Sequence, residues 1–407
     1  MKMVVLLLRL AVGLIVAILP LRDGLAQTAL CSPQTIADAA ARLAIARRAL
    51  LALPIREAPM TDVSSEAQNA AVAMKRRLGE LIEAYMRCAP MDGAVGSIKA
   101  DLARLGHARP EEEASVAHGT PPDETLRDGY YLDFAVKKCG DRPRILGISP
   151  WFQFECGSDA MLLVFVESGG GWREALRWES GPYKVVGGAL GAFDYAISPQ
   201  GHGRWFAVVK SVAPWCLSYW STIRYEALRP MPETTVPKVL YRAEERMWWG
   251  DEDFGTVTAG KDGFEVRFTG SSIDSGVHHR AWIRHFTIFR DDAVTRVDPL
   301  ALSPWDFADE WIVSPWDSAA RWSASVALRG VHDELHRIGS LDYESARLCR
   351  TAPDRVQVAL HSDETQASYF LLVAGRADYR MAAVSTKPDP ACDGEDLLSA
   401  GNEPKHH

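Results

Sequence analysis

Apolar side chains between residues 31 and 88 recur with the spacing of a helix. Residues 31–88 contain two such stretches, the first opening with Ser32-Pro33, an N-cap followed by proline at the first helical position. The second begins near Ser64, and its apolar residues are separated by alternating steps of four and three. The two stripes contain Ile36, Ala40, Leu43 and Leu50, then Met74, Leu78, Leu81, Tyr85 and Cys88. The pattern predicts a helical hairpin connected by residues 54–62.

Two antiparallel helices of similar length place the start of the first beside the end of the second. Cys31 and Cys88 stand at these ends, so we expect a disulfide between them. A third helix is predicted at 97–105, ending at Gly106. The helical domain therefore covers 27–106. Residues 107–128 mix proline, glutamate and small residues without periodicity, which is typical of a linker.

From Tyr130 onward the hydrophobic period is two, which predicts strands in a β domain over 129–386. The turns at 168–171 and 260–263 each join two strands as a hairpin. Many short strands between turns indicate an antiparallel sandwich, a barrel or a propeller-like fold, and the sequence leaves all three open. The predicted strands are 130–136, 160–167, 172–179, 183–187, 192–198, 204–211, 218–227, 236–242, 254–259, 264–269, 280–289, 292–297, 355–361, 367–374 and 377–385.

A helical insertion at 303–339 interrupts the strands, and a polar tail follows at 387–407. Ser-Pro-Trp-Asp occurs twice, at 303–306 and 314–317, and each copy predicts a helix start with serine as the cap. The whole pattern predicts an α+β protein: an α-helical hairpin followed by a predominantly antiparallel β domain.

The N-terminus has the features of a cleavable export signal. Lys2 and Arg9 precede an apolar run from Leu10 to Leu19, and Gly24 and Ala26 supply the small residues that a signal peptidase recognises. We expect a signal peptide at 1–26, cleavage after Ala26, and a periplasmic or secreted mature protein without a transmembrane segment.

Removing the signal changes the net charge from −8 to about −10, because Lys2, Arg9, Arg22 and Asp23 are lost. An acidic chain without a basic cluster is unsuited to nucleic acid, where phosphate contacts dominate the affinity. The sequence also lacks a dinucleotide fingerprint and a C-x-x-C motif, so we expect no cofactor.

Seven cysteines follow the signal, in a compartment where disulfides persist. Besides Cys31–Cys88, we expect Cys349–Cys392 to tether the tail. Cys139 and Cys156 are each followed by glycine, as in hairpin loops, and are predicted to pair. Cys216 is then the odd thiol.

Three carboxylates are candidate catalytic groups. Asp306, Asp309 and Glu310 share one face of the predicted helix after Ser303, since residues three and four apart are neighbours. A carboxylate pair beside tryptophans could hydrolyse glycosides. Acidic first turns also simply stabilise the helix dipole, and capping is the preferred interpretation.

Two histidines are candidate metal ligands. His332 and His336 stand four apart, like the zinc-binding pair of H-E-x-x-H, but Asp333 replaces the glutamate and no third ligand follows at a familiar spacing. His278 and His279 directly precede the predicted strand 280–289, which contains His285, and are treated as its extension. His279 and His285 would stand roughly 20 Å apart, so the three cannot form one site.

Two further motifs are set aside. Residues 255–261 fit the start of a phosphate-binding loop, but Asp262 replaces the required Ser or Thr and the segment reads as strand, turn, strand. The acidic run 251–253 could lie on a calcium loop but is typical of a solvated turn.

All thirteen tryptophans lie between Trp151 and Trp322. Such side chains suit both a large β core and a platform for sugar rings. Trp248 and Trp249 are neighbours that a strand would point in opposite directions, so one is expected to be exposed. Trp248, Trp249, Trp305 and Trp316 are the candidate ligand-binding residues.

Catalytic signatures such as G-x-S-x-G and S-x-x-K are absent from the sequence. The leading hypothesis is a non-enzymatic binding module of the cell envelope with a glycan or protein partner. The alternative is a hydrolase of envelope polymers that uses the carboxylates or a metal.

Overall fold

The structure is a computed structural model, in which the chain forms two compact units. The first unit comprises Met1–Gly191 and Pro230–Lys238, and the second comprises Ala192–Arg229 and Val239–His407. The predicted signal, the predicted strand 183–187, the acidic run 251–253, Cys156, Cys216 and His278 lie outside the described residues. The structure describes residues 31–54, 63–107, 127–141, 143–154, 157–181, 192–201, 204–213, 219–249, 255–274, 279–376 and 378–398.

The predicted helical hairpin is present in the first unit. Helices α3 (Pro33–Leu51) and α4 (Ser65–Met86) are followed by α5 (Val95–Gly106). The side chain of Ser32 caps α3 ahead of Pro33, and that of Ser64 caps α4 by accepting a hydrogen bond from the Ala67 amide. The predicted disulfide Cys31–Cys88 is confirmed, and it closes the end of the hairpin opposite the connection.

A four-stranded antiparallel sheet completes the first unit. Its strands follow one another in chain order: β1 (Leu132–Asp141), β2 (Arg144–Phe154), β3 (Gly157–Ser168) and β4 (Gly171–Glu179). The predicted hairpin at 168–171 is present, with Gly169 and Gly170 both at positive φ, a conformation that glycine adopts without a steric penalty.

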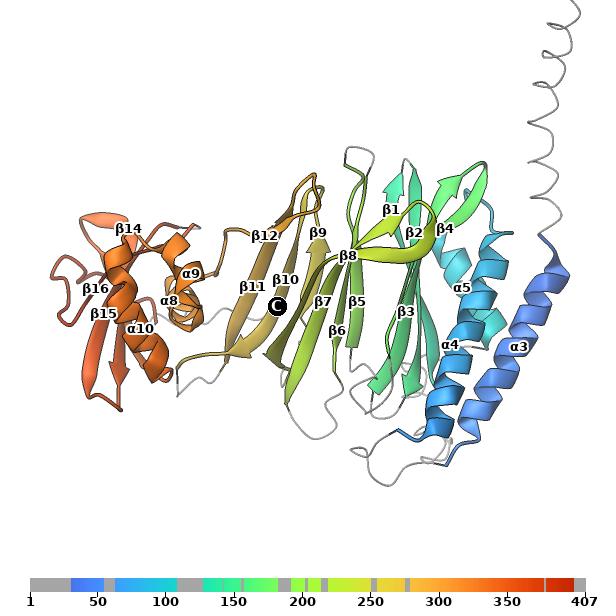
Figure 1. The fold of residues 1–407 in the computed structure, drawn as a ribbon, viewed down its shortest axis with the longest axis horizontal. Coiled ribbons are helices and arrows are strands. Elements are labelled where there is room, and N and C mark those ends of the chain that lie inside the picture. Colours follow the sequence, from blue (N-terminus) through green and yellow to red (C-terminus); the bar gives the residue numbers. More distant parts are fainter. Residues whose placement is uncertain are drawn as a thin grey trace, which may run out of the picture. The chain divides into compact units, whose positions relative to one another are not determined.

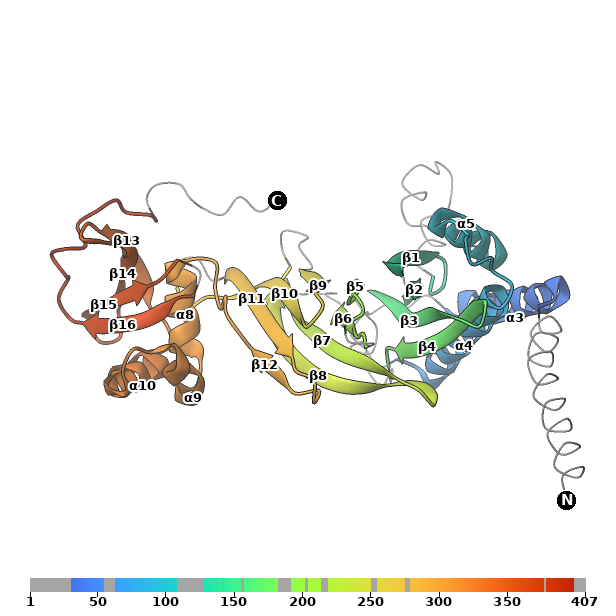
Figure 2. The same ribbon diagram turned by 90° about the horizontal axis from the view of Figure 1, so that it is seen from above.

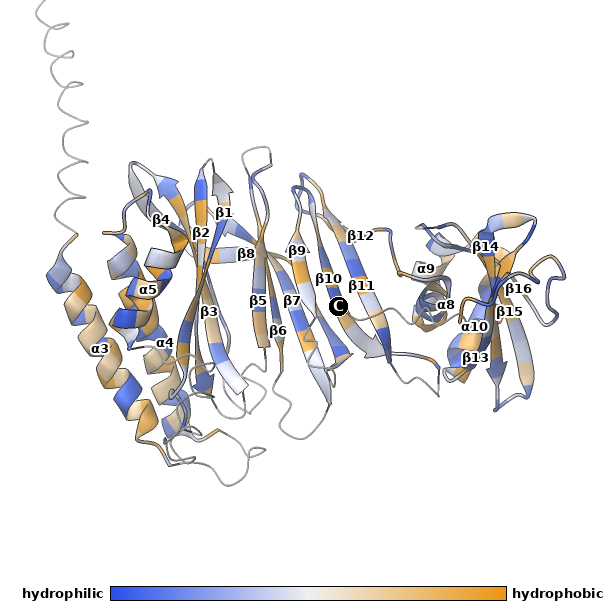
Figure 3. Ribbon diagram, turned by 180° about the vertical axis from the view of Figure 1, so that it is seen from behind, coloured by the Kyte–Doolittle hydropathy of each residue, from blue (hydrophilic) through white to orange (hydrophobic). Residues whose placement is uncertain are grey.

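The helices and this sheet share one hydrophobic core. Met74, Leu78 and Leu81 of α4 pack in the same cluster as Phe134 of β1 and Phe152 of β2. Figures 1 and 2 show the three helices beside the sheet, and Figure 3 shows apolar and polar stretches alternating along α3 and α4. Residues on both sides of 107–128, the segment predicted as a linker, therefore contribute to one core.

A buried ion pair also joins helix to sheet. Lys75 Nζ of α4 lies 3.3 Å from both carboxylate oxygens of Asp159 on β3, and both side chains are almost completely buried. Lys75 also donates to the carbonyl oxygen of Ser180, at 2.6 Å. Burial raises the pKa of Asp159 to about 6, although the Lys75 charge acts in the opposite direction.

The second unit begins with two more four-stranded antiparallel sheets in chain order. The predicted strand, turn, strand at 255–269 is present as the β9–β10 hairpin, with Gly260 donating to the carbonyl of Gly263. The strands are β5 (Ala192–Ile197), β6 (Ala207–Val212), β7 (Trp220–Met231) and β8 (Thr234–Trp248), then β9 (Thr256–Ala259), β10 (Gly263–Ser271), β11 (His279–Ile288) and β12 (Val294–Arg296).

The predicted helical insertion and a last sheet complete the second unit. Helices α8 (Pro304–Val313), α9 (Trp316–Ala319) and α10 (Arg329–Ile338), with the 3-10 turns η2 (Ala320–Trp322) and η3 (Val326–Leu328), share a core with the last sheet. That sheet has strands β13 (Asp342–Cys349), β14 (Ala352–Ser362), β15 (Ala367–Ala374) and β16 (Arg380–Ser385). The protein is thus α+β with a predominantly antiparallel β part.

The second predicted disulfide, Cys349–Cys392, is also confirmed. It holds the chain after β16 against β13, where Gly394 donates to the carbonyl of Leu348 and Leu397 to that of Ala346. The first part of the predicted polar tail is therefore docked on the last sheet.

The pairing predicted for Cys139 is not formed, because Cys139 is a free cysteine. Its hairpin joins β1 to β2, whereas Phe154, the last described residue before Cys156 in the sequence, lies at the other end of β2. From Ile145 to Phe154 the strand extends roughly 30 Å, while the Cα atoms of a disulfide lie within about 7 Å. Consecutive hairpin turns stand at opposite ends of the strand they share, which proximity in sequence conceals.

In the described part of the chain, every helix is too short or too polar to cross a bilayer.

Removing the Cys31–Cys88 bridge should lower the free energy of unfolding by about 3–4 kcal/mol, because the closed loop holds the unfolded chain together over 57 residues. Urea unfolding of the Cys31→Ala, Cys88→Ala double variant measures this effect. Cys139→Ala is the matched control and should change stability much less. An equal loss in the two proteins would contradict the role of the bridge.

Candidate functional site

The first Ser-Pro-Trp-Asp copy starts α8 as predicted. Ser303 Oγ accepts from the Asp306 amide at 3.1 Å and donates to Asp306 Oδ2 at 2.7 Å, with Pro304 in the first turn. The second copy differs from the prediction, since Ser314 is the C-cap of α8 and α9 begins at Trp316 without a side-chain cap. Its serine thus ends one helix and does not start the next.

The three candidate carboxylates are buried. Asp306 is 7% exposed, Asp309 0% and Glu310 2%. Asp309 Oδ2 accepts from the Ile273 amide at 2.8 Å and from Ser272 Oγ at 2.9 Å. These bonds attach α8 to the chain after β10, a structural task that already occupies the carboxylate.

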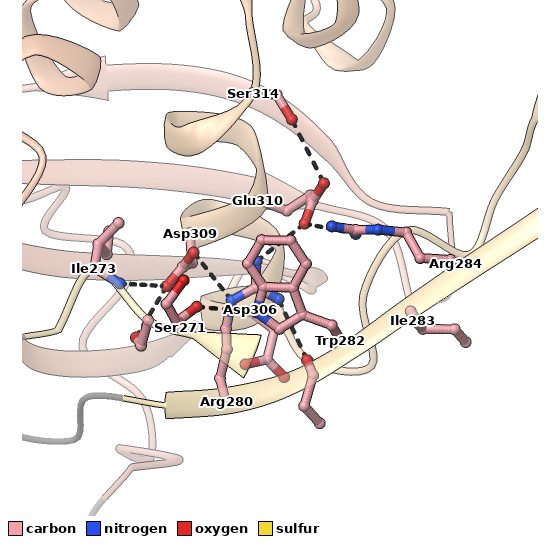
Figure 4. Close-up of polar contacts among 12 residues, drawn as sticks. Ser271, Ile273, Arg280, Trp282, Ile283, Arg284, Asp306, Asp309, Glu310 and Ser314 are labelled. Carbon is pink, nitrogen blue, oxygen red and sulfur yellow. Dashed lines mark hydrogen bonds and ion pairs between the residues drawn. The ribbon is translucent and has the colours of Figure 1, made fainter. Parts of the chain in front are cut away.

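Three arginines form hydrogen bonds with Glu310. Its carboxylate accepts from Arg280 Nη2 at 3.0 Å, from Arg284 Nη1 at 3.1 Å and from Arg296 Nη1 at 2.6 Å. Arg280 Nε also lies 3.0 Å from Asp309 Oδ1. We call Arg280, Arg284, Arg296, Glu245, Asp309 and Glu310 the arginine–carboxylate cluster, part of which is drawn in Figure 4.

The sheet presents these arginines on one face. Arg280, Trp282 and Arg284 alternate along β11, so they point the same way. Both guanidinium groups lie over the Trp282 ring, with the Cζ of Arg280 4.4 Å and that of Arg284 4.1 Å from its centroid (Figure 4). Arg284 also donates to Glu245 of β8, at 2.6 Å from Nη2. The cluster thereby joins β8 and β11 to α8.

Burial and the neighbouring arginine charges shift the pKa values of these carboxyl groups in opposite directions. Burial alone would raise the pKa of Glu310, but the charges of Arg284, Arg296 and Arg280 hold it well below its usual range. Burial raises the pKa of Asp306 to about 6 against the opposing effect of Arg280, and it also raises the pKa of Asp309. These carboxylates neutralise buried arginines and connect α8 to neighbouring segments. The arrangement favours a structural role for them over a catalytic one.

The candidate metal ligands face carbonyl oxygens. His332 Nε2 lies 3.1 Å from the carbonyl oxygens of Trp311 and of Ser314, and His336 Nδ1 lies 2.7 Å from that of Ile312. A ring nitrogen bonded to a carbonyl carries a proton, so each ring could offer a metal only its other nitrogen. The two rings therefore satisfy carbonyls at the end of α8 that lack helical partners.

Among the described residues, three or more His, Cys, Asp or Glu side chains nowhere gather into a group that could hold a metal. His279 and His285 lie six residues apart on β11, as the strand assignment predicted.

The candidate tryptophans separate into two groups. Trp305 and Trp316 pack against the core of the last sheet, and the Trp316 ring lies 5.2 Å from that of His332. Trp248 and Trp249 lie in a group of partly exposed rings at the ends of strands, where Trp249 also packs against the hydrophobic core that contains Phe264 and Phe286. We call Tyr219, Trp220, Trp248, Trp249 and His279 the aromatic cluster.

Trp248 is the centre of the aromatic cluster. Its ring stacks on His279 at a centroid distance of 5.3 Å and 14°, and lies 5.3 Å from both Tyr219 and Trp220. Trp249 follows the end of β8, so strand alternation no longer separates it from Trp248, and its ring also lies 5.4 Å from Tyr219. Tyr219 is 57% exposed. In the described part of the chain, no acceptor takes the indole N–H of Trp248.

Sequence reasoning missed Tyr219, Trp220 and His279. A usable signal existed for the first two, because the hairpin of β7 and β8 places the start of one strand beside the end of the other. The amide of Trp249 indeed donates to the carbonyl of Tyr219, at 3.0 Å. His279 comes from β11 of the next sheet, and the sequence gives no sign of that approach.

Neither a scan of protein-family models nor a search of curated proteins gives a match for this chain.

Glu310→Gln should destabilise the protein by about 3–5 kcal/mol, because it leaves three buried guanidinium groups without their shared charge. Chemical unfolding measures the loss. Glu364→Gln is the matched control, since its pair with Arg337 is exposed and should contribute less than about 1 kcal/mol. Equal effects would show that the cluster is not a stabilising centre.

Asp306→Asn should reduce the loss of stability on going from pH 4 to pH 7. A carboxyl whose folded pKa is raised to about 6 contributes stability below its unfolded pKa, and this contribution disappears as the pH rises through 6. The variant should gain roughly 2 kcal/mol on the unaltered protein over this interval. Unfolding at both pH values tests it. The exposed Asp363→Asn serves as control, and a parallel pH profile for Asp306→Asn would contradict the expectation.

Proposed function

We propose that the protein is a non-enzymatic binding module of the cell envelope, and that the aromatic cluster contacts its ligand. The proposal rests chiefly on the grouping of five rings, on or directly next to β7, β8 and β11, without full burial of any of them. Large aromatic side chains in a β protein normally enter the core, as Phe264 and Phe286 do here. Rings that remain half-buried together are typical of a contact surface.

The chemistry of the aromatic cluster suits a glycan. Sugar rings offer C–H faces to aromatic planes and hydroxyl groups to polar edges, and tryptophan supplies both an apolar face and an N–H donor. Arg246 adds a cation, with its Cζ 4.5 Å from the Trp220 ring centroid. Because His279 and Tyr219 flank the Trp248 ring, a sugar would stack on the exposed Tyr219 and meet the edge of Trp248.

The rival hydrolase hypothesis has less support. Its carboxylates, Asp306, Asp309 and Glu310, are nearly inaccessible and bonded to arginines and backbone amides. Its proposed metal ligands, His332 and His336, face helix carbonyls. A catalytic site needs such groups to converge on a space for substrate.

The expected export signal leads us to propose a periplasmic or secreted location. Two disulfides in the described residues suit an oxidising compartment. An envelope glycan, or a protein that carries one, would be encountered there.

Tyr219→Ala and Trp248→Ala should each weaken binding of soluble peptidoglycan fragments at least about tenfold, a loss of ~1.4 kcal/mol. Titration calorimetry gives the affinity, and tryptophan fluorescence reports the contact with the cluster.

Trp305→Phe and Trp316→Phe are matched controls, because these rings pack against the core of the last sheet and should leave the affinity unchanged. Two results would contradict the proposal: no saturable binding by the unaltered protein, or equal weakening in the control variants.

A further inference from the structure

A small pocket in the second unit is lined by basic side chains from four separate turns and strands. It has a volume of about 50 Å³, room for a few water-sized groups. Arg204 comes from the chain before β6, Arg229 from β7, Lys261 from the β9–β10 turn and Arg290 from the turn after β11. One acidic residue, Asp262, also lines the pocket.

The most informative of these residues is Arg229, which is only 9% exposed. Its Nε lies 3.0 Å from Asp292 Oδ1 but makes no hydrogen bond with a described residue. A guanidinium group has five N–H donors, and buried ones normally find acceptors. Arg229 is thus a largely buried cation that is paired with one carboxylate and whose Nε donor has no hydrogen-bond acceptor among the described residues.

The available negative charge does not balance the basic groups. Asp292 is shared between Arg229 and Arg204, whose Nη2 donates to the same oxygen at 2.8 Å. Arg204 also donates from Nη1 to the carbonyl of Arg290, which ties the two turns together. With Asp262 and Asp292 set against four cations, an excess of two positive charges remains around a small space.

The backbone leaves room for this arrangement. A Cβ on Gly201 would stand 2.8 Å from Lys261 Cγ and 3.1 Å from Lys261 Cε, so only glycine lets the lysine stem lie across this position. Burial lowers the pKa of Arg229, with Asp292 opposing and Arg204 reinforcing the shift, as expected for a cation short of acceptors. A bound anion would supply those acceptors.

We propose that this pocket binds one tetrahedral oxyanion, a phosphate group, that accepts hydrogen bonds from Arg229 and pairs with Lys261 and Arg290. Compact size and several converging guanidinium and ammonium donors suit phosphate chemistry. The group could arrive as free inorganic phosphate or as the phosphoryl group of a sugar phosphate. The site is separate from the aromatic cluster and does not depend on it.

Titration calorimetry of the protein with inorganic phosphate and with glucose 1-phosphate, at constant ionic strength, tests the proposal. Saturable binding of either anion is expected. Similar affinities would identify the free anion as sufficient, whereas binding of glucose 1-phosphate alone would identify a phosphorylated sugar. Absence of binding for both would overturn the proposal.

Lys261→Ala and Arg290→Ala should each weaken the binding at least about fivefold, and neither has a partner within the described residues that its loss would leave unpaired. Arg376→Ala removes an exposed charge from the turn between β15 and β16 and is the matched control. Gly201→Ala should weaken binding by displacing Lys261. Equal weakening in Arg376→Ala, or full binding in both the Lys261 and Arg290 variants, would show that the pocket is not the site.

Discussion

Glu310 is the residue on which the second unit most depends. One carboxylate, 2% exposed, receives guanidinium groups from two positions of β11 and one of β12. The cost of removing each of these charges from water is offset only while all of them remain together. The position of α8, which carries this carboxylate, is therefore fixed relative to β11 and β12. Arg284, which also pairs with Glu245, extends the same constraint to β8.

Buried polar groups serve a related purpose elsewhere in the molecule. In the first unit, Lys75 and Asp159 join α4 to β3, and Arg47 of α3 donates to the carbonyls of Gly129 and Tyr130. At the end of α8, His332 and His336 satisfy helix carbonyls. Apolar contacts stabilise these units but do not fix the orientation of a helix against its sheet. Directional hydrogen bonds to buried groups do fix that orientation. Such orienting bonds explain why this sequence contains clustered ionisable side chains that look like catalytic groups.

Local features of the fold could be predicted from the sequence because their causes are local. The cap at Ser303, the glycine turn at 168–171 and the stripe along α4 each depend on residues a few positions apart. The missed strands have misleading composition. β2 contains Gly147 and Pro150 and is apolar on both faces, while β13 carries charged residues and follows a helix directly. Partners distant in sequence, such as those of Glu310 and the ring of His279, leave no local pattern to read.

The Cys31–Cys88 bridge also alters how the helical hairpin can fluctuate. Helix ends ordinarily fray, so amide hydrogens of a first turn exchange with solvent through small openings. Here the residue just before the N-cap of α3 and the residue just after the C-cap of α4 are covalently joined, and the chain itself connects the helices at the other end of the hairpin. The two helices cannot separate from either end. Slow exchange should therefore extend to the bridged terminus, and the amides of both helices should become accessible together.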